Sequence, residues 1–139
     1  MAAYNLLLSS SYDECRKLQD FLEVMAEREG FSEAFLRELG FVVKEAFVNA
    51  VRHGNSGKKA ATVNLGFESL LDNGGRTLII EIADSGSGFA MHEIADPTCS
   101  SLLMKSSGRG VFLMQAFAEI IGQECEENGW RLRLRMKPY

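Results

Sequence analysis

The stretch Glu45-Ala-Phe-Val-Asn-Ala-Val-Arg-His-Gly54 combines the apolar spacing of a core helix with polar residues that such a helix would not need. Glu45 and Asn49 are four residues apart, so their side chains share one helix face, and Arg52 falls on the same side. The opposite side continues an apolar stripe with spacings of three and four: Leu36, Leu39, Val43, Ala46, Phe47 and Ala50.

The polar face of this helix has two interpretations. A ligand site would use Asn49 as a hard oxygen ligand for Mg²⁺ and Glu45 as a base within reach of a hydroxyl or water. The alternative is an exposed polar strip, and the helix alone does not decide between them. His53 lies near the same stripe, where a lone histidine is more often a capping or packing residue than a catalyst.

The segments before this helix predict a strand and a first helix. Residues 4–8 form a short apolar stretch, and Ser11 is a candidate cap for a helix that Gly30 ends. Ser32 then opens the second helix, which is expected to run to His53, before the Gly54-Asn55-Ser56-Gly57 break.

The segments after it predict hairpins on either side of a lid and a helix. Residues 62–69 and 77–83 read as strands joined by Asp72-Asn73-Gly74-Gly75, and residues 111–121 read as a helix. A last hairpin turns at Asn128-Gly129, and its arginines at 131, 133 and 135 predict the charged outer face of an edge strand. This order predicts an α+β, two-layer sandwich: a mixed sheet with helices on one face.

Two glycine-containing motifs could form a ligand pocket with the helix. Asp84-x-Gly86-x-Gly88 follows an apolar strand, where Asp84 could accept a hydrogen bond from an exocyclic amino group. Gly108-Arg109-Gly110 opens the helix that begins at Val111, where free backbone N–H groups could face phosphate oxygens. Taken alone, the Asp84 motif is more often a glycine-rich turn capped by Asp, and many helices begin with Ser and Gly for capping alone.

Composition limits the class of protein. The chain has 139 residues, 46% of them hydrophobic, which suits one domain. A net charge of −4 argues against direct, sequence-independent binding to nucleic acid. Three widely spaced cysteines without a CxxC pair suggest neither disulfides nor zinc, and no apolar run predicts a membrane span. A cytoplasmic protein is therefore expected.

Taken in order, the three motifs resemble those of the GHKL (Bergerat-fold) ATPases. Residues 45–54 resemble the N box of that family, and residues 84–88 and 108–110 resemble its two glycine boxes. The form with Asn-Ala-x-x-His-Gly and a short lid is similar to the anti-sigma serine kinases of sporulation and stress response. The resemblance covers the chain from Tyr4 onward, as a single domain.

The resemblance implies ATP and Mg²⁺ as ligands and a role for each motif. Asn49 would hold Mg²⁺, Glu45 would be the catalytic base, and Asp84 would read the adenine amino group. A lid of about residues 89–107 would close on the phosphates. The other residues that the resemblance assigns to the nucleotide site are Arg52, His53, Gly86, Gly88, Phe89, Gly108, Arg109, Gly110 and Val111.

The resemblance also implies protein partners. The phosphoacceptor would be a serine of an anti-anti-sigma protein, and the kinase, as a homodimer, would otherwise sequester a sigma factor. One alternative is a switch that binds ATP and changes partner affinity without phosphate transfer, against which the presence of Glu45 counts. Another is the ATP module of a two-component sensor kinase, which the first strand's position almost at Met1 does not favour.

Overall fold

The computed structural model describes residues 2–9, 11–51, 62–84, 114–126 and 129–139. Residues 114–117 form one further helical turn. The elements, in chain order, are β1 (Ala2–Ser9), the short 3₁₀ helix η1 (Tyr12–Glu14), α1 (Cys15–Glu29), α2 (Glu33–Asn49), β2 (Thr62–Asp72), β3 (Gly75–Asp84), β4 (Glu119–Glu126) and β5 (Gly129–Met136).

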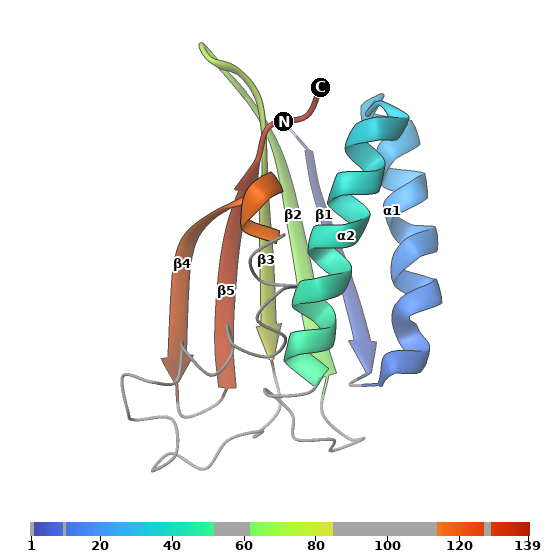
Figure 1. Cartoon of the computed structure of the whole chain (residues 1–139), viewed down its shortest axis with the longest axis vertical. Helices are drawn as coiled ribbons and strands as arrows, with labels where there is room; N and C mark the ends of the chain where they lie inside the picture. Colours follow the sequence, from blue (N-terminus) through green and yellow to red (C-terminus); the bar gives the residue numbers. More distant parts are fainter. Residues whose placement is uncertain (1, 10, 52–61, 85–113, 127–128) are drawn as a thin grey trace.

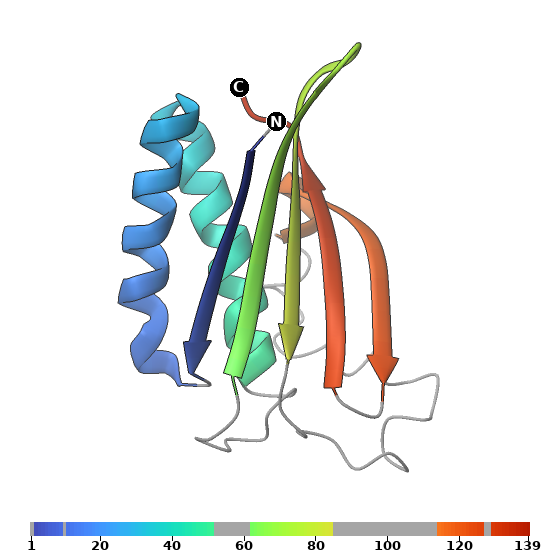
Figure 2. The same ribbon diagram turned by 180° about the vertical axis from the view of Figure 1, so that it is seen from behind.

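The strands form one sheet in the order β1-β2-β3-β5-β4. Figure 1 shows α1 and α2 on one face of this sheet, and Figure 2 shows the other face, which we call the open face, with no described helix over it. The predicted two-layer α+β class is confirmed.

The sheet is not mixed as predicted, because every described pairing is antiparallel. The connection between β1 and β2 explains this for the first pair. It passes along α1 and back along α2, which returns the chain to the end of the sheet where β1 stopped (Figure 1). A strand that starts there can only run opposite to β1.

The predicted helix boundaries hold at three of the four ends of α1 and α2. The hydroxyl of Ser11 accepts a hydrogen bond from the N–H of Asp13 at the entry to η1 and α1. Gly30 ends α1 in the left-handed conformation with φ 71°, and the Ser32 hydroxyl accepts from the N–H of Phe35 at 3.1 Å.

The end predicted for the second helix cannot be compared, because Ala50 and Val51 are still helical after α2 and His53 lies outside the described residues. The last predicted helix ends earlier than expected. The helix predicted over residues 111–121 is helical at 114–117 and becomes β4 at Glu119. Strand pairing prevails there, because Ile120 lies opposite Leu134 in the β4–β5 ladder and packs against the core.

The β4–β5 ladder contains an irregularity between Ile120 and Gly122. Ile120 opposes Leu134, and Gln123 opposes Leu132, so three residues of β4 span two of β5. Ile121 is the extra residue of a bulge. The bulge keeps Ile120 and Gln123 on the helix side of the sheet, opposite two buried leucines.

The core lies between the helices and the sheet. Its members have almost no exposed surface, and each large side chain contributes about 1.5–3 kcal/mol through burial. The largest fully buried side chains are Phe35, Phe47, Phe67, Leu8, Leu18, Leu22, Met25, Leu39, Leu65, Leu78, Ile80 and Ile82.

The arginine row of β5 does not belong to an edge strand, which corrects the prediction. β5 lies between β3 and β4, and its arginines are on the open face, opposite carboxylates on both neighbours. Glu81 on β3 pairs with Arg131 at 3.6 Å and Arg133 at 3.5 Å, while Arg135 pairs with Glu119 on β4. The arginines of β5 therefore balance the negative charges of Glu81 on β3 and Glu119 on β4.

One polar contact ties the end of α1 to the sheet. The hydroxyl of Tyr4 on β1 donates to Glu29 Oε2. This hydrogen bond, with another from Ser69 and the charge of Arg76, holds the pKa of Glu29 below its ordinary value. Arg76 also lies over the ring of Phe31, 5.3 Å from its centroid, directly after α1.

We expect Tyr4→Phe to lower the free energy of unfolding by about 1 kcal/mol at neutral pH, because one net hydrogen bond is lost. The folded-state pKa of Glu29 is depressed, so its contribution is present above the ordinary pKa of 4.5 and is lost as the pH falls below that value. Urea unfolding at several pH values should show the wild type and Tyr4→Phe converging under acid. A difference that does not change with pH would contradict this assignment.

Candidate functional site

The last turn of α2 buries a polar side chain. Asn49 is only 4% exposed, and it lies among the buried residues Ala46, Ala50 and Val51. Asn49 takes part in a polar interaction, in keeping with the need of a buried amide for a partner. The exposed-strip interpretation is therefore wrong for Asn49.

Glu45 lies one turn before Asn49 on α2 and is half-buried. No hydrogen bond or ion pair from its carboxylate to another described residue occurs in the structure. The carboxylate thus combines partial burial with access from outside, which a general base requires.

Asp84 is the last residue of β3, where it lies opposite Val63 of β2. Figure 1 shows that β3 and α2 finish at the same end of the molecule. The fold thus brings Glu45, Asn49 and the backbone of Asp84 to this end, although they come from different elements. The other predicted site residues, from 52–53, 86–89 and 108–111, lie outside the described part of the chain.

The donor groups at this end suit magnesium bound together with phosphates. Within the described ranges, no three His, Cys, Asp or Glu side chains gather as a metal site. A nucleotide-bound Mg²⁺ needs none, because phosphate oxygens and waters supply most of its ligands and the protein adds one or two. The amide oxygen of Asn49 fits that requirement.

The helical turn at 114–117 anchors the chain that follows the second glycine motif. Met114 is fully buried in the core, and Phe117 meets Phe41 of α2 edge to face, with ring centroids 6.1 Å apart. The turn and the site helix α2 are therefore in direct contact.

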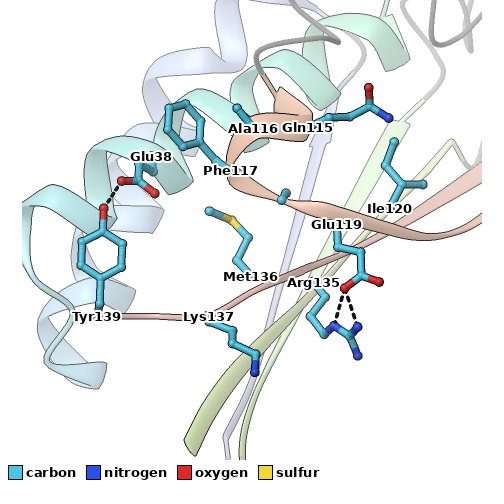
Figure 3. Close-up of a pocket in the computed structure, with 11 residues that line it drawn as sticks. Glu38, Gln115, Ala116, Phe117, Glu119, Ile120, Arg135, Met136, Lys137 and Tyr139 are labelled. Carbon is cyan, nitrogen blue, oxygen red and sulfur yellow. Dashed lines mark hydrogen bonds and ion pairs between the residues drawn. The ribbon is translucent and has the colours of Figure 1, made fainter. Parts of the chain in front are cut away.

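Sequence reasoning missed a groove of about 650 Å³ at the other end of α2. Figure 3 shows Phe117 and Met136 beside this groove. On one side the hydroxyl of Tyr139 donates a hydrogen bond to Glu38, and on the other side Arg135 forms an ion pair with Glu119. Glu38 is eleven residues before Asn49, about 16 Å along a helix, so this groove is separate from the candidate site. No local motif could reveal it, because it joins three distant segments.

The chain matches the histidine kinase-like ATPase domain over residues 8–136. It therefore belongs to this family of ATPase domains, and the resemblance to the GHKL superfamily is confirmed.

Two of the proteins to which the chain is similar illustrate this family relationship. The Serine-protein kinase RsbW of Oceanobacillus iheyensis is 30% identical over 104 residues, which cover 70% of this chain and 63% of that protein. The chain thus spans less than two thirds of this relative. The crystal structure of the RsbU and RsbW domains of Rv1364c from Mycobacterium tuberculosis matches with a TM-score of 0.61 and 14% identity. The match covers 99% of this chain and 33% of that one, and at this identity it shows the fold alone.

No helix in the described part of the chain is long and apolar enough to cross a membrane.

Substitutions at Phe47 and Phe117 should differ in cost because the two side chains differ in burial. Phe47→Ala removes a fully buried ring from α2 and should lower the free energy of unfolding by about 3–5 kcal/mol. Phe117→Ala removes a ring that is 42% exposed and should cost about 1 kcal/mol, mainly the aromatic pair with Phe41. Denaturant unfolding measures both, and equal costs would contradict the contacts described for Phe117.

Proposed function

We propose that the chain is an ATP-dependent serine/threonine protein kinase and anti-sigma factor that phosphorylates a serine of an anti-anti-sigma protein in a partner-switching system. The observation that carries the proposal is the buried Asn49 one turn after the accessible Glu45, at the end of the molecule where β3 ends in Asp84. The ATPase family and the similarity to a serine-protein kinase support it.

In this proposal each residue has a role suited to its chemistry. The Asn49 amide oxygen would hold Mg²⁺, which supplies positive charge to the phosphates. Asp84 would accept a hydrogen bond from the adenine amino group. Glu45 would orient the serine hydroxyl and take its proton as the oxygen attacks the terminal phosphorus, leaving ADP.

The partners follow from the same proposal. The unphosphorylated anti-anti-sigma protein would be the substrate, and a sigma factor would be the protein that the kinase sequesters. The working form would be a cytoplasmic homodimer of single-domain chains. Support comes from the resemblance to anti-sigma kinases and from the similarity to RsbW.

Nucleotide binding is the first requirement. Calorimetry with ATP and Mg²⁺ should show binding by the wild type, and Asn49→Ala and Asp84→Asn should each weaken it at least about tenfold, because each removes a polar contact. Matched controls are Asn5→Ala on β1 and Asp20→Asn on α1, both exposed. The proposal would lose its basis if the wild type did not bind ATP, or if the two site variants bound ATP as tightly as the two controls.

Catalysis by Glu45 is the second requirement. Glu45→Gln should retain ATP affinity but lower phosphate transfer from ATP to a purified anti-anti-sigma protein by about a hundredfold or more, the usual contribution of a general base. Glu33→Gln, an exposed carboxylate in the first turn of α2, is the control. Wild-type ATP binding without any phosphate transfer would instead favour the ATP-dependent binding switch.

A further inference from the structure

The groove beside Glu38 and Tyr139, at the end of α2 opposite Asn49, is large enough for a small molecule. Its volume of about 650 Å³ lies within the range of about 300–1,000 Å³ that such sites usually enclose. Apolar side chains line it together with charged groups. A few polar groups among apolar ones fix the orientation of a ligand in sites of this kind.

Two aromatic rings frame the groove, and α2 holds each of them in place. Tyr139 meets Phe35 edge to face, with ring centroids 5.8 Å apart, and Phe117 meets Phe41 in the same way at 6.1 Å. Phe35 and Phe41 are six residues apart, about 9 Å along the helix. Phe117 nevertheless remains 42% exposed and Tyr139 62% exposed. The two rings are therefore positioned by α2 and still free to contact a ligand.

Glu38 lies between these two contacts on α2 and carries the charge of this part of the groove. It is three residues after Phe35 and three before Phe41, so successive side chains in this series are neighbours on the helix surface. Figure 3 shows its carboxylate between the rings of Phe117 and Tyr139. The carboxylate accepts a hydrogen bond from the neutral hydroxyl of Tyr139, and it forms no ion pair with another described residue.

The other charged groups of the groove are paired or lie elsewhere. Arg135 and Glu119 form an ion pair with each other. The ammonium of Lys137 lies beside the turn between β2 and β3, because a Cβ atom at Gly74 would be 4.0 Å from its Nζ. Figure 3 shows the Lys137 side chain pointing away from Glu38. Among the described residues, the carboxylate between the two rings is thus left without a counter-ion.

A carboxylate beside aromatic rings is suited to bind an organic cation. The face of an aromatic ring attracts a cation placed within about 6 Å of its centroid, and a carboxylate adds a full opposite charge. The net charge of −4 also favours the approach of cations over that of anions. An anionic ligand in the same place would meet the like charge of Glu38.

We propose that the groove beside Glu38 and Tyr139 binds a small organic cation, a substituted ammonium group on an apolar frame. The ammonium group pairs with the carboxylate of Glu38 and lies against the rings of Phe117 and Tyr139. The apolar frame packs on Ile120, which also lines the groove. The inference goes beyond the proposed kinase function, because this groove and the candidate nucleotide site lie at opposite ends of α2.

The probe for this site is phenethylammonium, which joins an ammonium group to an aromatic ring. Titration of the isotope-labelled full chain, followed by NMR, should give a Kd of about 1 mM or below, as expected for so small a ligand. The amide signals that move should be those of the groove residues at 115–120 and 135–139. Phenethyl alcohol and hydrocinnamate have similar shapes but no positive charge, and they should bind at least about tenfold more weakly.

Two variants test the groups that hold the cation. Glu38→Gln removes the charge but keeps the shape of the side chain, and it should weaken phenethylammonium binding about tenfold. Phe117→Ala should weaken binding about threefold, because one contact between the cation and a ring is lost. Glu33→Gln at the start of α2 and Tyr12→Ala in η1 are the matched controls. Both remove an exposed side chain outside the groove and should leave binding unchanged.

Lys137→Ala distinguishes a cation site from an anion site in the same groove. It should leave phenethylammonium binding unchanged or strengthen it, because a like charge is removed. Tighter binding of hydrocinnamate than of phenethylammonium, lost in Lys137→Ala, would show an anion site and overturn the inference. So would the absence of phenethylammonium binding, or equal losses in Glu38→Gln and Glu33→Gln. Tighter binding of the tripeptide Gly-Arg-Gly would indicate a basic protein segment and overturn the assignment of a small ligand.

Discussion

The complete burial of one face of α2 in the core is the constraint on which the rest of the structure depends. Leu39, Val42, Val43, Ala46 and Phe47 have no exposed surface, and Ala50 and Val51 extend this burial past the end of the assigned helix. A polar side chain on so deeply buried a face is costly unless a partner satisfies it. Asn49 is such a residue, so the element that stabilises the fold also fixes the polar group of the candidate site.

Local chemistry predicted much of the fold. The caps at Ser11 and Ser32, the glycine stop at Gly30 and the turn after Asp72 all act within a few residues, and the structure has each of them. The position of a strand within the sheet depends on long-range pairing, which local sequence patterns do not predict. The last β-strand looked like an edge strand because of its arginines, but its place inside the sheet depends on β3 and β4, to which no local pattern refers.

The candidate site, too, could be predicted from the sequence only in part. The spacing of Glu45 and Asn49 predicted a shared helix face, but only the packing of neighbouring residues showed that Asn49 is buried. The groove beside Glu38 and Tyr139 had no sequence signal, because its lining residues come from three segments that only the packing brings together. The arginines of β5, which were conspicuous in the sequence, are largely occupied with carboxylates on neighbouring strands.

The return of the chain along α1 and α2 also affects how the sheet can assemble. The β2–β3 hairpin closes across a short turn, and its loop-closure entropy is small. Even the nearest pair of the β1–β2 ladder, Ser9 and Thr62, is separated by more than fifty residues. The first strand of the chain can therefore join the sheet only after a long segment, including both helices, has been made and brought back. Its place at the edge of the sheet lets it add last without disturbing strands that are already paired.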